Sequence, residues 1–107
     1  MKEAPEELFF DSHLITDVTW AGLLWYLGVT LIRVVIHRNV VYYEFECPSE
    51  DWKIYEAEWA SPEPVTVEAK AFANALGAVH NLRGKARNND GEWINKPAVR
   101  IYSGGVK

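Results

Sequence analysis

Apolar and polar positions alternate most clearly between residues 29 and 47, where TLIRVVIH, RN and VVYYEFEC predict two strands joined by a two-residue turn. Asn39 suits this turn because the primed hairpin turns need positive φ, whereas Arg38 is a poorer choice there. The expected register pairs His37 with Val40, Ile36 with Val41, Val35 with Tyr42, Val34 with Tyr43, Arg33 with Glu44, Ile32 with Phe45 and Leu31 with Glu46. One face of this hairpin is wholly apolar, and the other places opposite charges across the ladder, as a correct register should.

A short helix is predicted over residues 17–27, with Thr16 as its N-cap and Gly28 just after its end. At 100° per residue its core stripe is Trp20, Leu23, Leu24 and Leu27. The opposite face is apolar as well, and it is formed by Val18, Ala21, Gly22 and Trp25. This helix is therefore either enclosed within the domain or offers those four residues to a partner, including a second copy in a homodimer.

Two further helices follow from apolar positions spaced by one helical turn. The first covers about residues 50–60, is capped by Ser49 and carries the aromatic stripe Trp52, Tyr55 and Trp59. The second covers about residues 67–86, and its core stripe is Phe72, Ala75, Leu76, Val79 and Leu82. The segment SPEP, 61–64, is a stiff connector between them.

These elements predict an α+β fold: a helix, a two-stranded antiparallel hairpin, two further helices and an edge strand in AVRIYS, residues 98–103. Residues 8–12 are expected to form a short strand or an anchoring segment. Because a two-stranded sheet is marginally stable alone, helices must cover the hairpin or a second copy must extend it. We take residues 1–107 as one domain, with 1–7 as a frayed lead-in and 87–107 as a C-terminal extension.

Composition narrows the class of protein. A hydrophobic content of 49% in 107 residues argues against disorder, and the single cysteine, Cys47, cannot form an internal disulfide. The first ten residues are acidic and lack the apolar region of a signal peptide. The longest apolar stretch, residues 18–36, is too interrupted for a membrane span. We therefore expect a cytoplasmic protein without membrane contact.

No residue pattern indicates catalysis or a bound metal. His13, His37 and His80 are far apart in the sequence and lack the spacing of metal ligands. Cys47 precedes Pro48 at a strand end, where a cysteine is more often a packing residue than a nucleophile. No glycine-rich phosphate loop follows a strand. We expect a non-enzymatic protein that needs no cofactor.

Charge is distributed unevenly, since residues 1–68 carry 13 acidic and 4 basic side chains, while residues 69–107 carry 2 and 7. An acidic surface with aromatic anchors suits a basic, nucleic-acid-binding groove on another protein, because charge steers association and aromatic rings supply the desolvated contact. The candidate partner-binding residues are Glu44, Glu46, Glu50, Asp51, Trp52, Glu56, Glu58 and Trp59. Alternatively, the aromatic residues form the core face of their helix and the acids solvate its back.

The basic C-terminal third offers another interpretation. Arg83, Lys85 and Arg87 lie at or just past the end of the last predicted helix and are candidate phosphate-binding residues. Cations at that position also complement the helix dipole without any ligand. A pI near 5.3 argues against a dedicated nucleic-acid-binding protein.

Three stretches, LITDVTWAGLLWYLG, YYEFEC and VTVEAKAFANALGAVHNLR, follow one another in an order that resembles a small uncharacterised domain of phage and mobile-element proteins. The matching positions are Thr16, Asp17, Ala21, Gly28, Phe45, Val67, Ala69 and Phe72, within about residues 10–86. The resemblance implies a fold pattern and a phage-like context, and it supplies no catalytic residues.

From these observations we expect a small protein-binding module of phage type that inhibits a host nucleic-acid-handling defence machine through its acidic aromatic surface. The alternatives are a nucleic-acid-binding accessory protein that uses the basic residues and a structural homodimer joined through the first helix.

Overall fold

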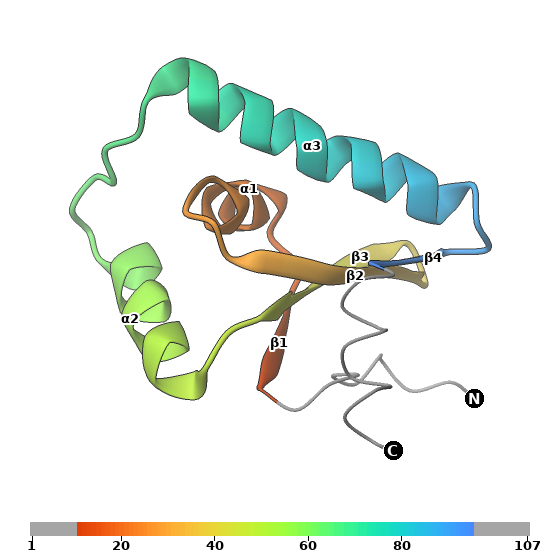
Figure 1. Cartoon of the computed structure of the whole chain (residues 1–107), viewed down its shortest axis with the longest axis horizontal. Coiled ribbons are helices and arrows are strands. Elements are labelled where there is room, and N and C mark those ends of the chain that lie inside the picture. Colours follow the sequence, from red (N-terminus) through yellow and green to blue (C-terminus); the bar gives the residue numbers. More distant parts are fainter. Residues whose placement is uncertain (1–10, 96–107) are drawn as a thin grey trace.

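The computed structural model describes residues 11–95, which form four strands and three helices (Figure 1). In chain order the elements are β1 (Ser12–Ile15), α1 (Val18–Tyr26), β2 (Thr30–His37), β3 (Val40–Glu46), α2 (Ser49–Ala60), α3 (Ala69–Arg87) and β4 (Glu92–Ile94). The strands build one antiparallel sheet in the order β1-β3-β2-β4. The α+β prediction is confirmed, and the hairpin is extended at both edges. β1 shares only Ser12 with the segment 8–12, where a short strand was one of two expectations, and β4 was not predicted. The predicted strand at 98–103 lies outside the described residues.

The β2–β3 hairpin follows the predicted register along most of its length. Arg38 and Asn39 both have positive φ, +53° and +68°, as a primed two-residue turn requires. The pairs from His37 with Val40 to Arg33 with Glu44 are as expected. The register then shifts at Ile32, so that Leu31 rather than Ile32 lies opposite Phe45. The predicted pairs of Ile32 and Leu31 are wrong because β2 has a β-bulge here, with one extra residue on this strand. Beyond the bulge, residues that were expected on one face of the hairpin lie on the other.

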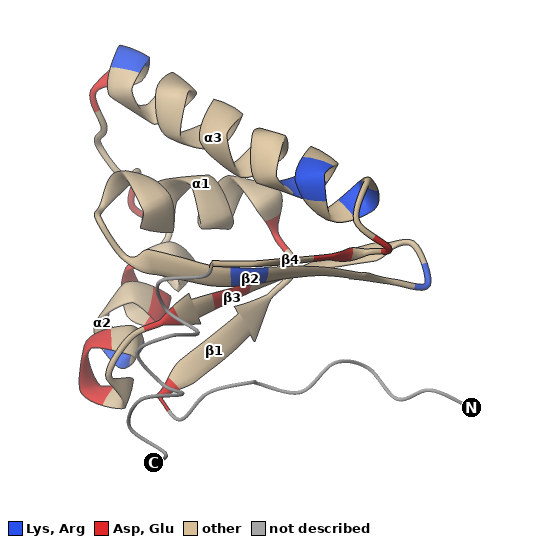
Figure 2. Ribbon diagram, turned by 45° about the vertical axis from the view of Figure 1, so that its right-hand side comes forward, with Lys and Arg blue, Asp and Glu red and all other residues tan. Residues whose placement is uncertain are grey.

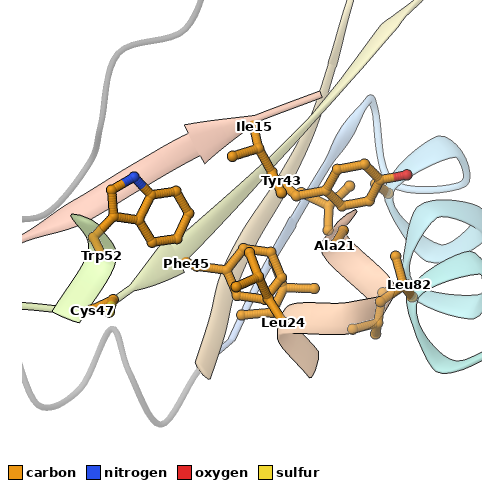
Figure 3. Packing of buried hydrophobic residues seen from close by; sticks show 12 residues of the cluster. Ile15, Ala21, Leu24, Tyr43, Phe45, Cys47, Trp52 and Leu82 are labelled. Atoms are coloured by element: carbon orange, nitrogen blue, oxygen red, sulfur yellow. The ribbon is translucent and has the colours of Figure 1, made fainter. Parts of the chain in front are cut away.

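The helices α1 and α3 cover one face of the sheet, and α1 lies between α3 and the strands (Figure 1). Side chains from this face of the hairpin pack against both helices in one hydrophobic cluster (Figure 3). Its members include Ile15, Ala21, Leu24, Leu31, Val34, Tyr43, Phe45, Val79, Leu82 and Ala86. Because α1 is enclosed on two sides, only Thr19 and Trp25 among residues 18–26 are exposed, which explains why its sequence is apolar nearly all round.

Helix ends differ from the prediction by one or two residues. Asp17, not Thr16, caps α1, because its carboxylate accepts hydrogen bonds from the backbone N–H groups of Thr19 and Trp20 at 2.9 and 3.0 Å. Ser49 lies inside α2, and the preceding Pro48 occupies the N-cap position. Gly28 follows α1 with a φ of +89°, which matches its predicted role at the helix end.

Gly22 marks the closest approach of α1 to α3. A Cβ atom at this position would lie 2.8 Å from Cδ1 of Leu76 and 3.4 Å from its Cα. Ala21 is fully buried, and Gly22 is buried as well. The expectation that Val18, Ala21, Gly22 and Trp25 form a self-association surface is therefore wrong for Ala21 and Gly22, because the chain itself covers them.

We predict that Gly22→Leu lowers the free energy of unfolding by about 2 kcal/mol, because the added side chain must displace Leu76. Gly77→Leu is the matched control: a Cβ at Gly77 meets nothing within 4 Å, so this variant gains helix propensity and is more stable by about 0.8 kcal/mol. Urea unfolding measures both. Equal effects of the two substitutions would contradict close packing of α1 on α3.

Candidate functional site

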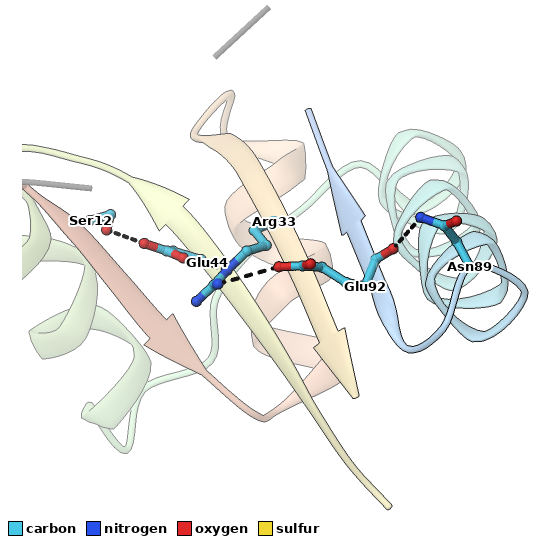
Figure 4. A network of polar contacts seen from close by, with 5 residues as sticks. All are labelled: Ser12, Arg33, Glu44, Asn89 and Glu92. Atoms are coloured by element: carbon cyan, nitrogen blue, oxygen red, sulfur yellow. Dashed lines mark hydrogen bonds and ion pairs between the residues drawn. The ribbon is translucent and has the colours of Figure 1, made fainter. Parts of the chain in front are cut away.

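A network of charged and polar side chains crosses the face of the sheet that is turned away from α1 and α3 (Figure 4). Glu44 has 0% of its surface exposed and Arg33 has 8%. Their side chains form an ion pair, with Nε of Arg33 2.9 Å from Oε1 of Glu44. The Ser12 hydroxyl donates a hydrogen bond to Oε2 of Glu44, and Nη1 of Arg33 lies 3.4 Å from Oε2 of Glu92. One residue from each strand thus contributes to this network.

Burial of Glu44 corrects the prediction that it belongs to an acidic binding surface. No partner can reach Glu44 because its side chain is fully enclosed, and its charge is compensated by Arg33 within the sheet. Glu46, two residues further along β3, is half-buried. The sequence did predict the pairing of Arg33 with Glu44, but it gave no signal that this pair is enclosed rather than solvated.

Stacked aromatic rings attach α2 to the rest of the protein. The ring of Trp52 lies parallel to that of His13 on β1, with centroids 4.4 Å apart. Trp20 on α1 stacks on both Trp52 and Trp59, at centroid distances of 5.3 and 5.7 Å. Trp52 is only 6% exposed and belongs to the hydrophobic cluster. It is therefore a core anchor of α2 and not, as predicted, a partner-binding residue, whereas Trp59 stays partly exposed at the end of the stack.

The opposite side of α2 is acidic and surrounds one exposed apolar side chain. Glu50, Asp51 and Glu58 are exposed and occupy positions i−4, i−3 and i+4 relative to Ile54, so they are its neighbours on the helix surface. Ile54 is 59% exposed. We call Glu50, Asp51, Ile54 and Glu58 the acidic face of α2. Glu56 is also exposed, but it is two residues from both Ile54 and Glu58 and therefore points to a different side of α2.

Ile54 is not among the predicted partner-binding residues, which are all acidic or aromatic. Its spacing from the three carboxylates was a usable signal, since an isoleucine on the polar side of a helix has no core to enter. A pocket of about 380 Å³ continues the surface past the end of α2. It is lined by Leu27, Glu58, Ser61, Glu63, Pro64, Val65 and Thr66.

Basic side chains gather at the other end of the protein, at the last turns of α3 and at the hairpin tip (Figure 2). Lys85 and Arg87 are exposed in the last turn of α3 and complement the helix dipole. Arg83 is half-buried beside the hydroxyl of Tyr43, and its role as a candidate phosphate-binding residue stays a prediction. The acidic face of α2 and the basic end of α3 are thus separate surfaces, although each region also contains charges of the other sign, such as Lys53 on α2 and Glu92 on β4.

Burial changes the pKa of two titratable groups of the core, Tyr43 and Cys47. Burial raises the pKa of the Tyr43 hydroxyl, and the nearby Arg83 guanidinium offsets part of this shift. Burial also raises the pKa of the Cys47 thiol, with a further contribution from Asp51. A buried thiol with a raised pKa is a weak nucleophile. Within residues 11–95 no cluster of three or more His, Cys, Asp or Glu side chains is arranged to hold a metal ion.

We predict that the protein loses stability as the pH rises above about 10, the ordinary pKa of tyrosine. The folded state keeps Tyr43 protonated where the unfolded state does not, so deprotonation favours unfolding. Tyr43→Phe should be less sensitive to pH above 10 than the wild type when urea unfolding is compared at pH 8 and pH 10.5. Parallel losses in the two proteins would contradict this assignment.

None of the helices within the described part of the chain is both long and apolar enough to cross a membrane. Comparisons of the chain with protein-family models, with curated proteins and with solved structures found no match. A functional proposal for this α+β protein therefore starts from the geometry of α2.

Proposed function

We propose that this chain is a non-enzymatic protein-binding module that presents the acidic face of α2 to a basic surface of its partner. The observation that carries this proposal is the exposure of Ile54, at 59%, in the middle of three carboxylates. Core packing does not use this side chain, because α2 packs through its opposite, aromatic side.

The carboxylates and the apolar side chain of Ile54 would contribute to binding in different ways. Exposed carboxylates raise the rate of encounter with a positively charged surface, and this effect weakens as salt is added. A central apolar side chain that loses its water on binding supplies most of the affinity. Helices that dock on partner surfaces commonly combine one apolar face with a polar rim.

The chemistry of the acidic face also suggests a class of partner. A surface evolved to bind nucleic acid is basic, and a helix with carboxylates around an apolar residue can compete with the phosphates for it. We therefore propose a nucleic-acid-handling protein as partner and inhibition of it as the outcome. The resemblance to domains of phage and mobile-element proteins makes a host defence machine the first candidate.

Affinity capture from host-type cell lysate, quantified by mass spectrometry, tests this proposal with variants of the tagged protein. Ile54→Ala should reduce the retained partner about tenfold because the desolvated contact is lost. Reversal of charge at Glu50, Asp51, Glu56 and Glu58 together should abolish retention. Lys53→Glu, which makes α2 more acidic, should increase retention at low salt.

Val40→Ala is the matched control, since Val40 is an exposed aliphatic residue at the hairpin tip, far from α2. It should retain the partner as the wild type does, and circular dichroism should show that all variants remain folded. Equal retention by the wild type and by the charge-reversed variant would refute the proposal. Gel-shift retardation of DNA or RNA at low salt, abolished by Lys85→Glu with Arg87→Glu, would favour the nucleic-acid-binding alternative instead.

A further inference from the structure

The pocket at the end of α2 combines an apolar lining with negative charge. Leu27 from the end of α1 and Val65 from the connector to α3 are 42% and 46% exposed, and both line it. Two of the large hydrophobic side chains that the described residues expose thus meet at one pocket. Glu58 and Glu63 contribute a carboxylate each, and the pocket lining contains no lysine or arginine.

The backbone adds further negative potential to this pocket. The last carbonyl groups of a helix carry the negative end of its dipole, and the last turn of α2 contains no basic residue to complement it. Ser61 donates its backbone N–H to the carbonyl of Glu58 at 3.3 Å, and its hydroxyl accepts a hydrogen bond from the N–H of Glu63. Within residues 11–95, neither Glu58 nor Glu63 forms an ion pair.

We infer that this pocket receives a long cationic side chain, lysine or arginine, from the partner. The aliphatic stem of such a side chain would lie on Leu27 and Val65, and its charged end would face the two carboxylates and the end of α2. A purely apolar ligand would match Leu27 and Val65 but would gain nothing from the two exposed carboxylates. A bare metal ion would find too few ligands, because no cluster of three ligating side chains exists among the described residues.

This inference rests on the proposed function, since a basic partner supplies the side chain, and it adds a specific site to the acidic face. Ile54 and the pocket lie one after the other along α2, so one extended basic segment would contact both. The pocket can nevertheless be tested without any partner, by the binding of small probes to the whole chain.

The experiment is a titration of the 15N-labelled protein, followed by NMR, with the Nα-acetyl N-methylamides of arginine, lysine and norleucine. The two cationic probes should shift the amide signals of Leu27, Ser61, Glu63, Val65 and Thr66 at millimolar concentration, as expected for a single exposed contact. Glu58→Gln combined with Glu63→Gln should weaken their binding roughly tenfold. Glu50→Gln combined with Asp51→Asn removes the same charge at the other end of α2, outside the pocket, and should leave binding of the two cationic probes unchanged.

Equal binding of norleucine would overturn the inference, because the pocket would then recognise the stem alone. Shifts that are absent from the pocket, or that both double variants weaken equally, would overturn it as well. None of these three results affects the proposed function, which is tested separately by the loss of partner retention in Ile54→Ala. Loss of the pocket shifts only in the Glu58 and Glu63 variant would establish the site even before a partner is known.

Discussion

The buried ion pair between Arg33 and Glu44 is the interaction on which the sheet depends. It joins the two central strands, β2 and β3, and each of its members contacts a residue of an outer strand, Ser12 on β1 and Glu92 on β4. A charge that is fully enclosed must be compensated, so any register that separates Arg33 from Glu44 is strongly disfavoured. The pair therefore selects one alignment of the four strands as well as stabilising it.

This alignment of the strands determines which surfaces of the protein stay exposed. With Glu44 and Arg33 on one face of the sheet, the alternating residues Tyr43 and Phe45 must point to the other, where α1 and α3 cover them. The aromatic side of α2 then packs on β1 and α1 through Trp52. The acidic face of α2, on the side opposite Trp52, therefore stays exposed, and the constraint that orders the sheet also determines which side of α2 a partner could contact.

The sequence predicted those parts of the fold that depend on local chemistry. The hairpin, its positive-φ turn and the three helices were visible in periodicity and in turn residues. β4 was missed and β1 was expected only as one alternative, four residues too early, because strands of three and four residues have too short a pattern. The bulge at Ile32 was missed because alternation alone does not reveal an extra residue. Burial of Glu44 and exposure of Ile54 depend on which elements pack together, so residue type alone pointed to the wrong members of the candidate site.

A double-mutant cycle on Arg33 and Glu44 tests most directly whether the buried pair organises the sheet. Arg33→Met and Glu44→Leu should each lower the free energy of unfolding by about 3 kcal/mol, because each leaves its partner's charge buried without compensation. The double variant should lose about 3 kcal/mol, no more than either single variant and about half of the additive loss, which gives a coupling free energy of about 3 kcal/mol in urea unfolding. Additive losses, with no coupling between the two positions, would contradict the account.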